Sequence, residues 1–306
     1  MSATAVVGSA AFPLTSASAA PASNVAEPFG YSLNTSTIRE QRIPVDREAE
    51  IAAKAGYNAF EPWLRELDEY AKKGGSLKDL GKKIADLGLK VESSIGFAEW
   101  IVDDDAKRKK GLETAKRDME MVLAIGGKRM AAPPMGATNE KIANLYTIAD
   151  RYRTLAELGR QVGIIPEVEL WGFSKTLSRL GETVFVAMES AHPDACILPD
   201  IYHLYKGHSE FDSIRLLNAK AIGIFHMNDY RDSISRDKIK DADRVYPGDG
   251  NAPLKQTLRT LRDIGYRGML SLELFNPEYW KQDAMLVAKT GLAKMKDVVQ
   301  ASLADS

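Results

Sequence analysis

Residues 164–172 read IIPEVELWG, an apolar run that becomes polar toward its end. Three later runs have the same layout: ACILPDIYH at 195–203, AIGIFHMND at 221–229 and GMLSLELFN at 268–276. Short apolar runs of this kind are typical of strands buried in a parallel sheet. The four runs therefore predict four buried strands, each with polar side chains at its C-terminal end.

The polar side chains at these strand ends form one candidate metal site: Glu169, Asp200, His226 and Glu273. Carboxylates and a neutral imidazole suit a divalent cation, for which we consider Mn²⁺, Mg²⁺, Co²⁺ and Zn²⁺. The chain between successive members is close to one βα unit of an eightfold barrel, which needs about 31 residues, with an extra loop before Glu273. Consecutive parallel strands would thus bring all four ligands to one face.

A repeat of helix, glycine and strand extends this arrangement toward the N-terminus. Glycine ends several helical patterns shortly before an apolar run, as at Gly56, Gly88, Gly126 and Gly163. Glycine suits that position because it readily adopts the left-handed conformation that ends a helix. Four further strands are expected at residues 29–35, 57–61, 89–95 and 128–133. Residues 28–306 are therefore predicted to form a single (β/α)₈ TIM barrel domain of the α/β class.

Capping residues indicate where helices begin. Ser76 with Asp79 resembles a capping box, and Asn139 and Ser174 precede apolar helical patterns. We therefore expect helices to begin at these three positions.

Composition excludes several classes of protein. The formal net charge is −1, so no overall positive field would attract nucleic acid or an anionic membrane. No apolar run reaches the roughly 18 residues that would span a bilayer. Cys196 is the sole cysteine, which rules out an intrachain disulfide, and its apolar surroundings favour a buried packing role.

Residues 1–27 differ from the rest of the chain. They are rich in alanine, serine and threonine, contain no lysine or arginine, and include small-residue sites of the A-x-A kind. This composition predicts a disordered tail or a signal-like segment, although a secretory signal normally begins with basic residues. Cytoplasmic and exported locations therefore both stay open.

The strand-end residues resemble the sugar phosphate isomerase/epimerase family, whose members have a xylose isomerase-like TIM barrel. The family pattern places a glutamate, D-x-x-H, H-x-x-D/E and a second glutamate on four consecutive strands. This sequence matches the family over nearly all of residues 29–300, with Glu169, Asp200 and His203, His226 and Asp229, and Glu273. The resemblance implies that the four strand-end residues bind the metal and that Glu169 and Glu273 also act as catalytic acid and base.

Five further side chains are expected to bind the substrate. The resemblance implies that His203 contacts a substrate hydroxyl, and that Arg244, just before a Pro-Gly-Asp-Gly turn, contacts substrate oxygens. Asp229 begins the loop that contains Arg244. Trp63 follows an expected strand end, where its indole ring would stack on a sugar. Lys175 stands where epimerases of this family often have a glutamate, which disfavours a ketose 3-epimerase and suggests an anionic or differently placed substrate.

The expected chemistry is proton transfer next to a carbonyl group. A divalent cation on the carbonyl oxygen stabilises the enediolate that forms when a glutamate removes the neighbouring proton. Return of a proton to the opposite face gives epimerisation, and its return to the neighbouring carbon gives isomerisation. The predicted function is therefore metal-dependent isomerisation or epimerisation of a small sugar or polyol carbonyl compound. Assembly into a homo-oligomer stays open.

Three other functions fit parts of the pattern. A lyase or dehydratase acting on a keto-sugar or inosose would use the same enolate and would differ in its products. A nuclease resembling type IV apurinic endonucleases would need many more than the four histidines present. A non-catalytic sugar-binding barrel would hold a sugar without exchanging its α-proton.

Overall fold

The computed structural model describes Met1 and residues 27–304. Of the tail or signal segment predicted at residues 1–27, only Met1 and Glu27 are described, so that prediction lies outside the described residues. Within the described part of the chain, no helix combines the length and apolar character needed to cross a bilayer.

The strands form two sheets in which every pair of neighbours is parallel. One sheet has the order β2-β1-β7-β6, and the other has the order β3-β4-β5. The strands are β1 (Gly30–Asn34), β2 (Ala59–Glu61), β3 (Arg129–Ala132), β4 (Ile165–Glu169), β5 (Cys196–Leu198), β6 (Phe225–Met227) and β7 (Met269–Leu272). The four strands that carry the candidate ligands are thus β4 to β7, in consecutive order around the ring.

Single bridges join the two sheets into a closed barrel. Residues 89–95, expected as a strand, pair with their neighbours only at isolated positions: Lys90 with Ala59 of β2, and Ile95 with both Trp63 and, in β3, Ala131. The prediction of a regular strand there was wrong, because these isolated bridges do not form a continuous ladder with either neighbour. On the other side, β5 and β6 are linked by the bridges Ile197–Ile222 and Asp200–His226. The ring nevertheless closes.

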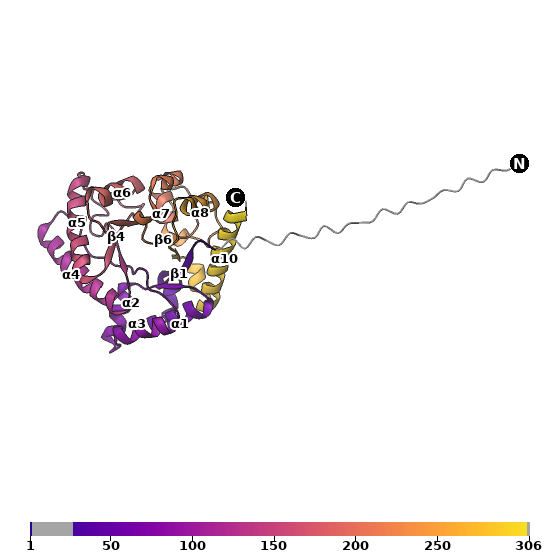
Figure 1. Cartoon of the computed structure of the whole chain (residues 1–306), viewed down its shortest axis with the longest axis horizontal. Coiled ribbons are helices and arrows are strands. Elements are labelled where there is room, and N and C mark those ends of the chain that lie inside the picture. The colour runs from indigo at the N-terminus through magenta and orange to yellow at the C-terminus, as the bar shows by residue number, and fades with distance from the viewer. Residues whose placement is uncertain (2–26, 305–306) are drawn as a thin grey trace.

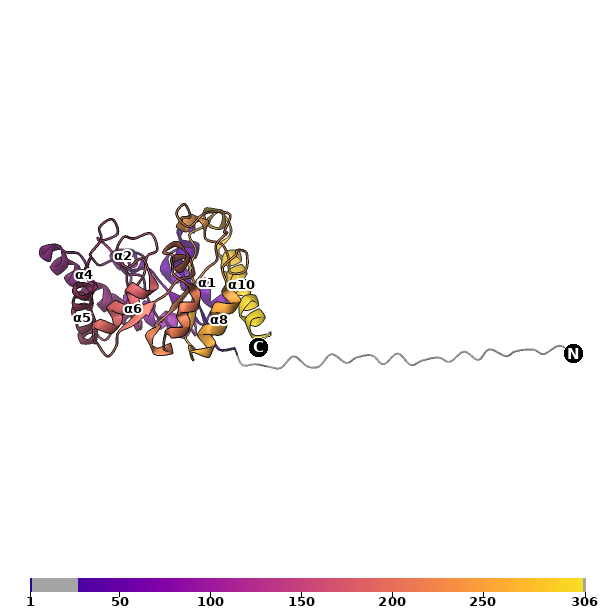
Figure 2. The ribbon, with the colours of Figure 1, turned by 90° about the horizontal axis from the view of Figure 1, so that it is seen from above.

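Helices surround the strands (Figure 1), and loops gather at one end of the barrel (Figure 2). The side chains of Leu33, Val168 and Val287 are fully buried in the apolar core. The helices are α1 (Val45–Ala55), α2 (Leu64–Lys72), α3 (Leu77–Asp86), α4 (Asp105–Ala124), α5 (Leu145–Val162), α6 (Leu180–Glu189), α7 (Ile201–Lys206), α8 (Leu254–Asp263), α9 (Pro277–Trp280) and α10 (Ala284–Ala304). The predicted TIM barrel is confirmed.

One of the three expected helix starts is confirmed. The Ser76 side chain accepts a hydrogen bond from Asp79 N, and α3 begins directly after it. The helix expected from Asn139 begins instead at Leu145, because the Thr176 hydroxyl accepts from the Ile142 N–H and donates to the Glu140 carbonyl. These bonds tie residues 140–142 to the loop after β4.

The same loop explains the third expected helix start. The Ser174 hydroxyl accepts from Thr176 N inside the loop, and α6 begins only at Leu180. Residues 171–179, which we call the β4 loop, therefore form an irregular segment that carries Trp171 and Phe173. Because loop residues at this end of a TIM barrel shape the active site, what holds the β4 loop bears on function.

Gly207, at the end of α7, provides a close contact with the β4 loop. A Cβ atom added at Gly207 would lie 1.8 Å from the Ser178 carbonyl oxygen, far inside any permitted contact. Gly207→Ala must therefore displace the β4 loop or α7, and overpacking of this kind costs about 1–3 kcal/mol. We expect urea unfolding to show that loss of stability.

Gly181 is the matched control for that substitution. It lies in the first turn of α6, and a Cβ atom there would meet nothing within 4 Å. Gly181→Ala should leave stability unchanged or raise it by about 0.5–1 kcal/mol, because alanine restricts the unfolded chain and favours helix. Equal stability of the two variants would contradict the proposed contact.

Candidate metal centre

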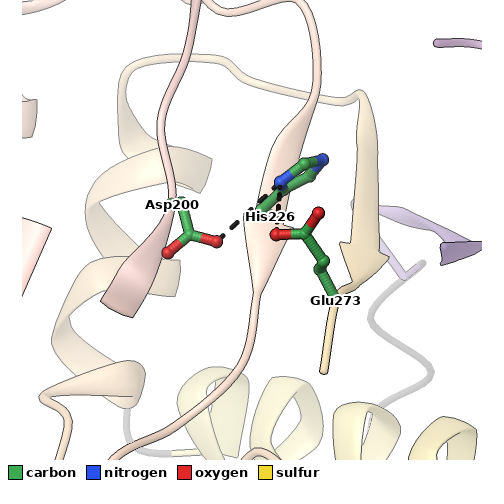
Figure 3. A group of neighbouring side chains, drawn as sticks. All are labelled: Asp200, His226 and Glu273. Carbon is green, nitrogen blue, oxygen red and sulfur yellow. Dashed lines mark ion pairs between the residues drawn. The ribbon is translucent and has the colours of Figure 1, made fainter. Parts of the chain in front are cut away.

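Three predicted ligands converge at the C-terminal ends of β5, β6 and β7 (Figure 3). His226 Nδ1 lies 3.2 Å from Glu273 Oε2 and 3.8 Å from Asp200 Oδ2. All three residues are buried. Parallel strands bring their C-terminal ends to one edge, so residues 26 to 73 positions apart in the sequence become neighbours. The arrangement gathers two carboxylates and an imidazole within 4.8 Å of one another.

Glu169, the fourth predicted ligand, ends β4 and lines the same cavity as Glu273. It does not belong to the tight group of three. Its Oε2 atom is buried and makes no hydrogen bond. Burial and the nearby Glu273 carboxylate raise the pKa of Glu169 well above its ordinary value. Burial also acts to raise the pKa of Glu273, but His226 and Arg244 hold it below its ordinary value.

Arg244 is built into this group of charges. Its Nη1 donates to Asp200 Oδ2 at 3.0 Å and to Glu273 Oε2 at 2.8 Å, and its Nη2 donates to Asp241 at 2.6 Å. The side chain is 1% exposed. A fully buried guanidinium with three carboxylate partners fixes the positions of those carboxylates. Arg244 therefore lies beside the candidate ligands as well as in the cavity wall.

Glu61, at the end of β2, is a member of the site that was not assigned to it from the sequence. Its two carboxylate oxygens each lie 3.1 Å from His226 Nε2. Asn34 Nδ2 and Ser271 Oγ donate to Glu61 Oε2 at 2.9 and 2.6 Å. A carboxylate that accepts from Nε2–H leaves Nδ1 as the lone-pair nitrogen, on the side of Asp200 and Glu273. The strand-end position of Glu61 was the available signal, but its partner on β6 was not visible in the sequence.

A cavity of about 280 Å³ opens on the site and has a largely aromatic wall. It is lined by Arg39, Trp63, Ile95, Phe97, Glu169, Trp171, Phe173, His203, Asp241, Arg244, Glu273 and Phe275. Trp63 packs on Phe97 and Phe275, with ring centres 5.1 and 5.9 Å apart. Burial and Arg244 lower the pKa of His203 well below its ordinary value, so its imidazole is neutral. Three predicted substrate-binding residues, Trp63, His203 and Arg244, thus meet in one wall.

Asp229 is placed differently from its predicted role. Its carboxylate accepts four backbone hydrogen bonds, from the N–H groups of Tyr230, Gly248, Gly250 and Ala252, at 2.8–3.1 Å. It is absent from the cavity wall. With its oxygens committed to the backbone, Asp229 shapes the loop after β6, and the structure does not bring it to the substrate cavity.

Lys175 also stays apart from the other candidates. It is exposed on the β4 loop and does not line the cavity. Its backbone N–H donates to the Thr138 carbonyl, which fixes the main chain but leaves the side chain at the surface. The expectation that Lys175 contacts the substrate gains no support from this position.

The residues present fit a divalent cation. His226 Nδ1 and Glu169 Oε2 are both buried and neither makes a hydrogen bond, although His226 Nδ1 is only 3.2 Å from Glu273. Buried polar atoms normally have partners, so two such atoms beside further carboxylates indicate room for a ligand that accepts lone pairs. Three carboxylates and one imidazole are a common donor set for Mn²⁺, Co²⁺ or Zn²⁺.

Known proteins resemble this chain in sequence and in fold. The model of the xylose isomerase-like TIM barrel family matches residues 49–298. An inosose isomerase of Bacillus velezensis is 26% identical over 258 residues, which cover 83% of this chain and 91% of that protein. A 3-dehydroshikimate dehydratase of Pseudomonas putida is 22% identical over 248 residues, covering 80% of this chain and 38% of that protein.

One solved structure with a similar fold contains a metal. It is the crystal structure of the IolI protein with a bound zinc atom, with a TM-score of 0.83 and 24% sequence identity. The match covers 90% of this chain and 99% of that chain. At this identity the likeness shows the fold alone.

Proposed function

This chain belongs to the xylose isomerase-like TIM barrel family, and from that premise we propose that it is a divalent-metal-dependent enzyme that isomerises or epimerises a small polyhydroxylated carbonyl compound. The observation that carries the proposal is the convergence of Asp200, His226 and Glu273 next to a cavity that Glu169 also lines. The similarity to an inosose isomerase supports a carbohydrate substrate.

The chain would hold the cation through the atoms that face one another. These are Asp200 Oδ2, His226 Nδ1 and Glu273 Oε2, joined by the unpaired Oε2 of Glu169. When bound, a divalent cation supplies Lewis acidity to the substrate carbonyl oxygen and so makes the neighbouring C–H group more acidic.

The protein side chains carry the proton and position the substrate. Glu273 is the proposed base, which removes the proton next to the carbonyl, and Glu169 is the proposed acid, which returns a proton. His203 and Arg244 would contact substrate oxygens from the cavity wall, and the indole of Trp63 would lie against carbon-bound hydrogens of the substrate.

Dehydration is the second candidate function, because a relative is a 3-dehydroshikimate dehydratase. Removal of the proton next to a carbonyl is also the first step of β-elimination. Glu169 could then deliver a proton to the leaving hydroxyl in place of the carbon. The same residues therefore serve both reactions, and the products tell them apart.

Proton NMR in D₂O tests the proposal with 2-keto-myo-inositol, ribulose and 3-dehydroshikimate as substrates and with diamagnetic Mg²⁺ or Zn²⁺ added. We expect deuterium at the carbon next to the carbonyl and the appearance of an isomeric ketone or aldehyde. A sample stripped with a chelator should show neither. Loss of water to an unsaturated ketone would identify a dehydratase, and metal binding without exchange in any compound would contradict both reactions.

A further inference from the structure

A second arginine lines the cavity: Arg39, in the 3-10 segment η1 (Thr35–Gln41) after β1. Its guanidinium carbon lies 4.3 Å from the ring centre of Trp63, 5.0 Å from that of Phe275 and 5.7 Å from that of Trp280. Both indoles are fixed by hydrogen bonds. The Trp63 indole N–H donates to Asn34 Oδ1, and the Trp280 indole N–H donates to the Ser36 carbonyl. Aromatic contacts hold a guanidinium by its faces and leave the N–H groups in its plane for other partners.

The guanidinium of Arg39 has no counter-ion within ion-pair distance among the described side chains. Its Nε is buried and makes no hydrogen bond. The Glu66 carboxylate lies close enough to affect the pKa of Arg39. It accepts hydrogen bonds from the Thr35 hydroxyl and from the backbone N–H of Trp63. Arg244 differs, because its two Nη atoms already donate to three carboxylates. Both arginines in the cavity wall have an Nε that makes no hydrogen bond, but Arg39 is the one whose Nη groups donate to no described carboxylate.

We propose that Arg39 binds an anionic group of the substrate, a carboxylate or a phosphate, while the carbonyl end of the same molecule lies at Asp200, His226 and Glu273. This inference rests on the proposed function and adds the class of substrate, which is a polyhydroxylated carbonyl compound that carries a negative charge.

Three physical arguments favour an anion over a neutral hydroxyl. A planar guanidinium matches a carboxylate or a phosphate with two parallel N–H···O bonds. The aromatic surroundings of Arg39 lower the local dielectric, which strengthens such a pair. A neutral polyol would leave a half-buried guanidinium without a directly paired carboxylate or phosphate, which is unfavourable. An anionic substrate was one of the two expectations for Lys175. The side chain of Lys175 lies at the surface, and Arg39 instead provides a positive charge at the cavity.

Isothermal titration calorimetry on the metal-loaded protein tests the proposal with matched probes. The open-chain probes are D-glucitol, D-gluconate and D-glucitol 6-phosphate, and the ring probes are myo-inositol, quinate and myo-inositol 1-phosphate. Each probe is titrated into the wild type, Arg39→Gln and Arg39→Lys. The control is Arg42→Gln, which removes a positive charge three residues away at an exposed position outside the cavity wall.

We expect the wild type to bind at least one anionic probe about tenfold or more tightly than its neutral counterpart, as a charge-assisted pair should allow. Arg39→Gln should remove that preference without weakening the neutral probe, Arg39→Lys should keep part of it, and Arg42→Gln should keep all of it. Carboxylate and phosphate probes identify which anion is preferred. A wild type that holds anionic probes no more tightly than neutral ones, or an Arg39→Gln variant that weakens both equally, overturns the proposal.

The two proposals fail in different ways. If Arg39→Gln loses the preference for anions but the wild type exchanges no substrate proton with solvent, the anion site is supported and the isomerase activity is contradicted. If the wild type and Arg39→Gln exchange the proton of a neutral ketose at the same rate, and no anionic compound is preferred, the isomerase activity is supported and the anion site is contradicted.

Discussion

Glu273→Gln should slow deuterium incorporation next to the substrate carbonyl by about 10²–10⁴-fold, the usual cost of losing a general base. Glutamine has nearly the shape of glutamate and keeps an oxygen that can face His226 and Arg244, so the cavity should persist. The amide cannot accept the proton. The measurement is the exchange rate in D₂O with metal at saturation, alongside the metal content of the purified variant.

The matched control is Glu278→Gln, five residues later on the same segment. Glu278 is exposed, and its carboxylate pairs with Lys281, the residue directly after α9, so its variant should exchange at the wild-type rate. Full metal occupancy with wild-type exchange in Glu273→Gln would show that Glu273 is a ligand without a proton-transfer role. Low metal occupancy in that variant would instead assign its defect to binding, which titration with excess metal separates.

Glu61→Gln should weaken metal binding by about 10–100-fold, the usual effect of removing the partner of a metal-bound histidine. The Glu61 carboxylate can accept from His226 Nε2–H, which in the neutral imidazole leaves the lone pair on Nδ1 for the cation. A glutamine can turn its NH₂ group toward Nε2, which favours the tautomer with the proton on Nδ1, where the cation would bind. Calorimetric titration of the metal-free protein with Zn²⁺ or Mn²⁺ measures the change directly, independent of activity.

Glu167→Gln provides the control, because Glu167 is also a buried glutamate of the barrel, on β4, but forms no hydrogen bond or ion pair with His226. Its Oε2 accepts from Ile224 N at 2.8 Å, and burial raises its pKa to about 7. The amide substitution there should leave metal affinity within about twofold of the wild type. Equal losses in both variants would mean that barrel packing, rather than the His226 tautomer, controls the metal.

The sequence was informative about the strand ends because β-strands impose a simple geometric rule. In a parallel barrel, the C-terminal ends of all strands share one edge, so a polar residue that follows an apolar run has a predictable place. Asp200, His226 and Glu273 were located by that rule and do lie together. Residues 89–95 show its limit, since an apolar run does not reveal whether a continuous hydrogen-bond ladder will form.

Side-chain partners were much harder to predict than strand ends. Asp229 follows β6 just as expected, but its carboxylate turns to four backbone N–H groups of its own loop. Glu61 and His226 are 165 residues apart and meet because β2 and β6 close the same ring. Arg39 stands in a segment without a strand or an apolar pattern. Such contacts depend on loop conformation and on packing across the barrel, which local sequence patterns do not encode.

The single bridges between the two sheets divide the barrel into two half-shells with a seam on either side. One half-shell contains β3, β4 and β5, and the other contains β2, β1, β7 and β6. Glu169 and Asp200 belong to the first, and His226 and Glu273 to the second, with the Asp200–His226 bridge on the seam itself. A cation bound by these four side chains would link the two half-shells at a seam where few backbone hydrogen bonds join them. Metal binding and the stability of the contact between the half-shells are then coupled, because a process that separates the half-shells must also release the ion.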